Sequence, residues 1–321
     1  MSMQPDAGDA VFGAGAGAGE GAGAGAGAGG VLRERPRLIN LAYRFLGSLA
    51  DAEDVVQETY MRWYAMSAQQ QAAIVSPGGW LTKVASRICL DLLGSARARR
   101  EKYVGEWLPE PLPDRAEWGG GRSEGTADPA DRVTLDESVG MAFLVVLEAM
   151  TPAERVAFIL HDVFRYPFSD IGEIVGRSPA ACRQLATSAR RRVRAHQSGA
   201  TDTDRRAGVV GAFKQAWESQ DIKALIGLLD PEVSVVSDGG GLVRTRLEPV
   251  VGSAEVVQSL LVISARAPGA TILERSVNGQ PGLVVEHEGV IMAVMAFDVV
   301  GDRIQHIWGV RNPEKLRLWA S

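Results

Sequence analysis

The segment from Thr151 to His196 constrains the fold of this chain more than any other. Thr151-Pro152-Ala153-Glu154 predicts a helix start, because threonine and glutamate can cap each other's backbone N–H groups and proline suits the first turn. Ser169 is expected to cap a short helix that Gly176 ends, and Ser178-Pro179 starts the next helix. Two helices joined by so tight a turn predict a helix-turn-helix.

The last of these helices separates an apolar face from an arginine-rich face. Cys182, Ala186 and Ala189 recur at helical spacing with Leu185 and Val193, so they are expected to be buried. The planar guanidinium can donate two parallel hydrogen bonds to phosphate or to guanine, and a helix N-terminus points backbone N–H groups at phosphate. A solvated basic helix end is the alternative, but the preceding helix and turn favour DNA recognition. The predicted DNA contacts are Arg177, Ser178, Arg183, Thr187, Arg190, Arg191 and Arg194.

Charge and composition restrict the function classes. The net charge is −5, yet the stretch 177–196 holds six arginines and no acidic residue, which indicates one local anionic contact. No apolar run approaches the roughly 20 residues of a membrane helix, and no secretory start is present, so a cytoplasmic protein without membrane contact is expected. Cys89 and Cys182 are expected to be reduced core residues rather than a disulfide or metal pair. No metal, cofactor or catalytic residue is predicted.

The chain divides into five segments by composition and period. Residues 1–31 are a Gly/Ala-rich leader with too few large apolar side chains to offset ordering entropy, so disorder is expected. Two helical blocks, 32–105 and 135–196, flank a Pro/Gly-rich linker at 106–134. Residues 207–321 form a block that begins with a helix and continues with stretches rich in β-branched residues, in which apolar and polar residues alternate. A second helix lies between these stretches, and the combination predicts an α+β domain. Its expected helices are 209–229 and 253–266, and its expected strands are 233–237, 242–247, 271–277, 283–287, 290–300 and 303–310.

The first helical block shows two amphipathic patterns. Asp51 with Asp54 resembles a capping box, and Ala52, Val55, Val56 and Trp63 follow it at helical spacing. A second apolar stripe begins at Trp80, and Lys83, Arg87 and Asp91 lie on its opposite face. Alone, the first pattern would indicate only a solvated acidic helix.

These motifs together resemble the extracytoplasmic-function (ECF) sigma factors of bacterial RNA polymerase. The stretch 51–58 resembles the family's region 2 helix, which docks on the clamp of the β′ subunit, and implies docking by Asp54, Gln57 and Glu58. The stretch 80–91 is similar to the helix that opens and reads the −10 promoter element, which implies contacts by Lys83, Arg87 and Asp91. Arg87 stands where many members carry asparagine, so the identity of the flipped base is not carried over. The stretch 151–194 resembles region 4, which binds the −35 element and the polymerase β flap.

Three further motifs resemble the group of these factors with a C-terminal SnoaL-like domain. They are Tyr103-Val104-Gly105-Glu106-Trp107-Leu108-Pro109-Glu110-Pro111, Asp238-Gly239-Gly240-Gly241 and Asn312-Pro313-Glu314-Lys315-Leu316. Leu242 replaces the lysine of the second motif, and the segment 278–282 matches a turn of the group in outline. The resemblance implies two all-α sigma domains, a region 2 bundle and a region 4 helix-turn-helix, followed by an α+β cone that packs on both. The implied interdomain contacts are Trp107, Leu108, Pro109, Asp238, Gly239, Gly240, Gly241, Asn312, Pro313, Glu314, Lys315 and Leu316.

The C-terminal block has a regulatory and an enzymatic interpretation. Some SnoaL-like domains catalyse cyclisation or isomerisation, which needs an acid/base residue in an apolar cavity; Asp238, His287 and His306 are the candidates. A lone strand histidine is more often structural, so a regulatory domain is favoured. The predicted function is a sigma factor that binds core RNA polymerase and promoter DNA. The alternatives are a helix-turn-helix regulator with a ligand-binding domain and a SnoaL-like cyclase or isomerase.

Overall fold

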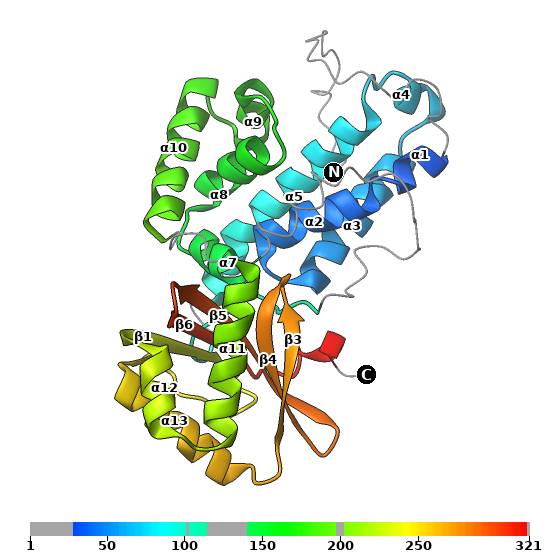
Figure 1. The fold of residues 1–321 in the computed structure, drawn as a ribbon. Coiled ribbons are helices and arrows are strands. Elements are labelled where there is room, and N and C mark those ends of the chain that lie inside the picture. Colours follow the sequence, from blue (N-terminus) through cyan, green and yellow to red (C-terminus); the bar gives the residue numbers. More distant parts are fainter. Residues whose placement is uncertain (1–27, 101–102, 114–139, 197–201, 320–321) are drawn as a thin grey trace.

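A computed structural model describes residues 28–100, 103–113, 140–196 and 202–319 of the chain. Most of the predicted leader, residues 114–134 of the predicted linker, and residues 135–139 of the second predicted block lie outside the described residues. The chain forms a helical body that contains α1 to α10 and, below it in Figure 1, a mixed α/β body that contains α11 to β6. No helix in the described ranges is long and apolar enough to cross a membrane.

The first helical block forms a bundle around α2 and α5. Its helices are α1 (Ala28–Leu32), α2 (Arg35–Leu46), α3 (Leu49–Tyr64), α4 (Ala68–Ala72) and α5 (Pro77–Arg100). The last residues of the predicted leader are therefore helical. The predicted Asp51–Asp54 capping box is wrong: Ser48 caps α3 and accepts a hydrogen bond from the Asp51 backbone N–H at 3.3 Å. Ser48 can do so because α2 ends at Leu46, Gly47 turns the chain with φ +69°, and α3 begins at Leu49.

The second helical block contains the predicted helix-turn-helix. Its elements are α7 (Met141–Glu148), α8 (Pro152–Phe158), the π-helical turn η1 (Ile159–Val163), α9 (Phe168–Val175) and α10 (Pro179–His196). The reciprocal cap of Thr151 and Glu154 is confirmed. The predicted cap by Ser169 is wrong, since Pro167 precedes α9 and the Ser169 hydroxyl donates to Asp170 instead. Gly176 ends α9 with φ +70°, a conformation that suits glycine. Ser178 accepts a hydrogen bond from the Ala181 N–H at the start of α10.

The two helical blocks share one apolar core. Leu38 and Phe45 of α2 and Leu81 of α5 belong to the same buried cluster as Ile159 and Ile171 of the second block. Cys89 and Cys182 are buried and free in it. A buried arginine crosses the junction: Arg155 donates to the backbone oxygen of Phe45 at 2.7 Å and to Glu148 at 2.8 Å. Burial lowers the pKa of Arg155 to about 9, so the guanidinium is charged at neutral pH. The blocks therefore pack against each other directly.

The C-terminal block is a curved six-stranded sheet with helices on one face. It contains α11 (Thr203–Glu218), α12 (Ile222–Leu228), β1 (Leu229–Asp238), β2 (Val250–Val251), α13 (Ser253–Arg266), β3 (Thr271–Val277), β4 (Gln280–His287), β5 (Val290–Val300), β6 (Arg303–Val310) and the 3-10 turn η2 (Arg317–Trp319). The strand order is β2-β1-β6-β5-β4-β3, in which β1 pairs parallel with β6 and every other pair is antiparallel.

Two expectations for this block are corrected. The single helix expected at 209–229 is two helices, because the chain turns at 219–221, where Gln220 has φ +55°. The strand expected at 242–247 is absent among the described residues; between β1 and α13 only Val250–Val251 forms a strand, which pairs with β1. Two left-handed glycines, Gly240 and Gly241, start this loop, and Pro249, which has no backbone N–H, ends it. The predicted bounds of α13, β3, β5 and β6 are confirmed, whereas β1 and β4 are found but begin before the predicted positions 233 and 283.

Each face of the sheet is buried against a different partner. On one face, Leu283 and Phe297 pack with Phe213 and Trp217 of α11 and with Leu260 of α13. On the other face, alternate strand residues pack with α7, the chain after α5 and the C-terminal turn; they form a cluster of Leu108, Met141, Val277, Val284, Val294, Ala296, Trp308, Val310, Leu316 and Trp319. The second face thus joins the mixed body to the helical body.

Candidate DNA interface and the interdomain strap

The arginine face of α10 lies on the surface of the helical body. Cys182, Ala186 and Ala189 are fully buried beneath it, which fixes the rotation of the helix. The exposed residues on the opposite side are Arg177, Ser178, Arg183, Thr187, Arg191 and Arg194. The Thr187 hydroxyl donates to the backbone oxygen of Arg183, so it is engaged within the helix. This face presents the exposed guanidinium groups of four arginines, which are groups that can bind phosphate.

Arg190 is placed differently from the other predicted DNA contacts. Its Nε donates to Asp162 Oδ1 at 2.6 Å, and its side chain is half-buried. Asp162 lies in the π-helical turn η1. The expectation that Arg190 lies on the exposed face with Arg191 and Arg194 is therefore wrong. Arg190 sits at the edge of that face, close enough to η1 to bond there.

The candidate contacts on α5 meet the second helical block. Lys83 and Arg87 are one helical turn apart, and both bind Glu173 of α9. Lys83 Nζ lies 2.6 Å from Glu173 Oε2, and Arg87 Nη2 donates to the Glu173 backbone oxygen at 3.2 Å. Asp91, one further turn along, is exposed. The predicted face of α5 therefore exists, but Glu173 of α9 partly covers Lys83 at its start, whereas Arg87 and Asp91 are exposed.

The candidate docking face on α3 is open. Asp54, Gln57 and Glu58 are all exposed, and Glu58 pairs with Arg62 at 2.5 Å. Beside them lies a surface hollow of about 740 Å³, lined by Arg35, Glu53, Val56, Gln57, Tyr60, Met61, Tyr64 and Ala65. Met61 is 64% exposed and Tyr64 50%. The sequence pattern missed these two residues, although their helical spacing from Gln57 and Tyr60 places them on the same side of α3.

Residues 103–113, called the strap below, run between the two bodies. The predicted linker is therefore packed over its first part. Asp238 at the end of β1 is fully buried and accepts hydrogen bonds from Tyr103 Oη at 2.6 Å and the Leu108 N–H at 2.9 Å. Lys315 Nζ lies 2.6 Å from the same carboxylate and also donates to the Leu108 backbone oxygen. The Lys315 ammonium stacks over the Trp107 ring at 4.1 Å.

The other side of the strap is bonded to the first helical block. The Glu110 N–H donates to the Gly47 oxygen at 2.8 Å, and the Glu110 carboxylate accepts from the Leu49 N–H at 2.8 Å. The Tyr43 hydroxyl donates to the Glu110 backbone oxygen at 2.6 Å. Burial raises the pKa of Tyr43, so this hydroxyl is a neutral donor. The strap thus satisfies its backbone groups through both bodies at once.

The turn between β3 and β4 completes this junction. Asn278, with φ +53°, donates from Nδ2 to Tyr43 Oη at 2.8 Å and accepts the Leu112 N–H at 3.1 Å. Its own N–H donates to the Leu112 oxygen at 2.8 Å, and Trp319 Nε1 donates to the Pro111 oxygen at 2.9 Å. Sequence reasoning recognised the turn but missed Tyr43, Glu110 and Asn278 as contacts. An Asn-Gly dipeptide was the available signal for Asn278; nothing in the sequence marks Tyr43.

The residues of the motifs at 238–241 and 312–316 differ in whether they contact the strap or only shape a local turn. An added Cβ would lie 2.2 Å from the Val243 oxygen at Gly239 and 2.3 Å from Asn312 Nδ2 at Gly240, so the close approach requires glycine at both positions. Pro313 and Glu314, predicted as interdomain contacts, are exposed and shape the local turn, in which Asn312 accepts the Glu314 N–H. Leu242, which replaces a motif lysine, is exposed; Lys315 supplies the cation at Asp238.

The buried Glu110 carboxyl makes stability depend on pH. Burial raises its pKa above the ordinary value of about 4.3, although the Leu49 N–H and Lys315 act in the opposite direction. Because the pKa is raised in the folded state, the contribution of the Glu110 carboxyl to the free energy of unfolding is full below about pH 4.3. This contribution is lost as the pH rises through the raised pKa. Glu110→Gln is therefore expected to be more stable than the unsubstituted chain at pH 7, with the advantage vanishing near pH 4. Urea denaturation from pH 4 to 7.5 measures this; Glu106→Gln, at an exposed strap position, is the control. A difference that is constant across this range contradicts the prediction.

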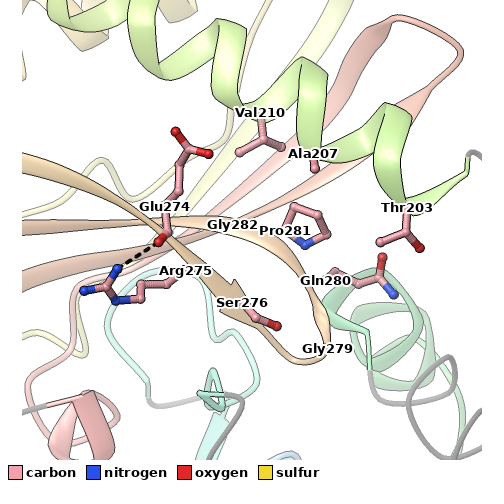
Figure 2. A pocket seen from close by; sticks show the side chains of 10 residues that line it. All are labelled: Thr203, Ala207, Val210, Glu274, Arg275, Ser276, Gly279, Gln280, Pro281 and Gly282. Atoms are coloured by element: carbon pink, nitrogen blue, oxygen red, sulfur yellow. Dashed lines mark hydrogen bonds between the residues drawn. The ribbon is translucent and has the colours of Figure 1, made fainter.

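The three candidate acid/base residues of the C-terminal block do not form one site. Asp238 is engaged at the strap, and Nδ1 of His306 lies 2.7 Å from the Ser234 hydroxyl. His287 ends β4, on another strand. A hollow of about 340 Å³ lies between α11 and the β3–β4 hairpin, and Figure 2 shows its lining, in which Arg275 donates to the Glu274 backbone oxygen. None of the three candidates lines this hollow, and no group of three His, Cys, Asp or Glu able to hold a metal occurs among the described residues.

Comparison with known proteins identifies both helical blocks and the whole arrangement. The family model "Sigma-70 region 2" matches residues 31–99, and "Sigma-70, region 4" matches residues 140–193. The chain is 36% identical over 294 residues to the ECF RNA polymerase sigma factor SigJ of Mycobacterium tuberculosis, which covers 88% of this chain and 90% of SigJ. The chain belongs to the ECF RNA polymerase sigma factors.

Other relatives of this sigma factor support the same assignment. A probable ECF sigma factor SigI of Mycobacterium tuberculosis is 34% identical and covers 88% of this chain and 92% of its own. The crystal structure of Mycobacterium tuberculosis SigJ superposes with a TM-score of 0.69 at 33% identity and covers 90% of this chain and 97% of that one. The sigma factor therefore acts in transcription initiation with core RNA polymerase and promoter DNA, and its two sigma regions precede a mixed-sheet domain of SnoaL-like arrangement.

Proposed function

We propose that this sigma factor recognises the −35 element through α10 and the −10 element through α5, while α3 binds the β′ clamp and region 4 binds the β flap. The exposed guanidinium groups of Arg183, Arg191 and Arg194 support the first role, since they lie on one face above a buried stripe. The exposed Asp54 and Gln57, next to the hollow that contains Met61, support the third. The sigma factor would do this work in the cytoplasm.

We propose that the SnoaL-like domain regulates the sigma factor and catalyses no reaction. The observation that carries this is the Asp238 carboxylate, whose four hydrogen-bonding partners tie the strap, the Asp238 loop and Lys315 together. This carboxylate is an acid/base candidate that is used entirely in holding the domains. Phe213 also packs edge-on against Phe297 and next to Trp217 between α11 and the sheet, where an enzyme would need space for a substrate.

Run-off transcription with purified core RNA polymerase tests these roles. The full chain should direct initiation at defined start sites on a promoter selected from a random DNA library, whereas core polymerase alone should not. A chain that ends at Arg206 should still co-purify with core polymerase but change the transcript yield. A helix-turn-helix regulator without sigma function would bind DNA but would not co-purify with core polymerase. Failure of the full chain to confer any start site would refute the proposal.

A further inference from the structure

Glu173 of α9 occupies the positively charged face of α5 described above. Its carboxylate lies 2.6 Å from Lys83 Nζ, and its backbone oxygen accepts from Arg87 Nη2 at 3.2 Å. The Lys83 side chain is only 24% exposed under this contact. Both cations are thus bound by acceptor oxygens from the helix-turn-helix of the same chain.

A carboxylate and a DNA phosphate offer the same chemistry to Lys83, since each presents anionic oxygens that accept hydrogen bonds from an ammonium group. Arg87 is exposed and is bound by the neutral backbone oxygen of Glu173. DNA on this face of α5 and Glu173 cannot contact the same Lys83 Nζ and Arg87 Nη2 in the same place. We propose that Glu173 is an intramolecular competitor of promoter DNA for Lys83 and Arg87, so that region 4 masks region 2 in the free sigma factor. This inference rests on the proposed role of α5 in −10 recognition.

Three contacts fix the second helical block against α2 of region 2, next to α5. Arg155 binds the Phe45 oxygen at the buried junction, the Arg37 guanidinium donates to Tyr166 Oη at 3.3 Å, and the Arg44 guanidinium lies 5.8 Å from the centre of the Phe164 ring. All three join region 2 to the segment between α8 and α9 or to α8 itself. These contacts keep Glu173 next to Lys83, so a phosphate that binds Lys83 has to displace the Glu173 side chain. The exposed face of α10 is accessible to DNA, whereas Lys83 on α5 is only 24% exposed beneath Glu173.

Two single substitutions on α9 separate this competition from a general change of charge. Glu173→Gln removes the carboxylate above Lys83, and Asp170→Asn removes an exposed carboxylate one turn earlier with the same change in net charge. The probe is a fluorescent single-stranded DNA of mixed sequence, and its binding to the full chain is measured by anisotropy without polymerase. Glu173→Gln should bind the DNA about threefold more tightly than Asp170→Asn, as expected for loss of a partly exposed ion pair. Equal affinities overturn the proposal.

A second variant and a second readout keep the test decisive. Glu173→Ala should match Glu173→Gln, while Lys83→Ala within Glu173→Gln should remove the gain; a gain that persists without Lys83 also overturns the proposal. In run-off transcription at limiting sigma factor, Glu173→Gln should raise the yield relative to Asp170→Asn. Absence of transcripts from every variant refutes the sigma function, and the comparison of DNA affinities still decides the masking.

Discussion

Asp238→Asn is expected to lower the free energy of unfolding of the sigma factor by about 3 kcal/mol or more, because removal of one partner from a buried ion pair leaves the other charge uncompensated. The Asp238 side chain is completely buried, and that of Lys315 is only 12% exposed. Asparagine keeps the shape of aspartate but neutralises the group that holds the Lys315 ammonium. It also weakens the hydrogen bonds from Tyr103 and the Leu108 N–H, which fix the strap.

Chemical denaturation measures this loss, and limited proteolysis locates it. The strap in Asp238→Asn should be cut faster than in the unsubstituted chain, since its backbone groups lose their partners. Asp302→Asn is the matched control: Asp302 pairs with Arg205 on the surface of the same domain, with side chains 71% and 56% exposed, and its loss should leave stability unchanged. Equal behaviour of the two variants would show that the strap does not depend on Asp238.

The second large effect is expected at α10. The double substitution Arg191→Ala and Arg194→Ala should weaken promoter binding by about thirtyfold or more, since each arginine contact to DNA contributes roughly 1–3 kcal/mol. If both contact phosphate, the slope of log affinity against log salt concentration should fall by about 1.8. Arg190 is left out of this test because it bonds to Asp162, so its removal would disturb the helical body as well.

Fluorescence anisotropy on a promoter duplex, measured from low to high salt, provides both quantities. The control is Arg205→Ala with Arg266→Ala, two exposed positions of the SnoaL-like domain that produce the same change in net charge. The control should reduce affinity only slightly and keep most of the salt slope. If the two double variants lose the same affinity, α10 does not form the DNA interface.

The sequence predicted those elements whose start, end and buried face are encoded locally. The reciprocal cap at Thr151, the stop at Gly176 and the start at Ser178 are side-chain or glycine signals within four residues of the helix ends they set. The strands 271–277, 290–300 and 303–310 were predicted with the bounds that the structure has, because β-branched residues fill them and turns separate them. The motif resemblance brought Asp238, Asn312 and Lys315 together correctly.

The sequence could not show how distant segments meet. Nothing in the sequence near Glu173 indicates that it bonds Arg87 and Lys83; Lys83 lies ninety residues earlier in the chain. Residues 106–134 were predicted as a linker, with Trp107, Leu108 and Pro109 as interdomain contacts, but nothing in their sequence shows that the carbonyl and N–H groups of the strap find partners on two bodies. Arg190 was assigned to the exposed face by helical spacing alone, and only the position of Asp162 in η1 shows that its guanidinium is bound at the edge of that face.

The parallel pairing of β1 with β6 has a consequence for how the protein is made. The start of the sheet can be completed only after its last strand has been synthesised, and Lys315 follows that strand. On a ribosome that adds 5–20 residues per second, regions 2 and 4 therefore emerge on the order of ten seconds before the residues that fasten the strap. Every newly made molecule passes through an interval in which both sigma regions exist before the contacts between the strap and the SnoaL-like domain can form.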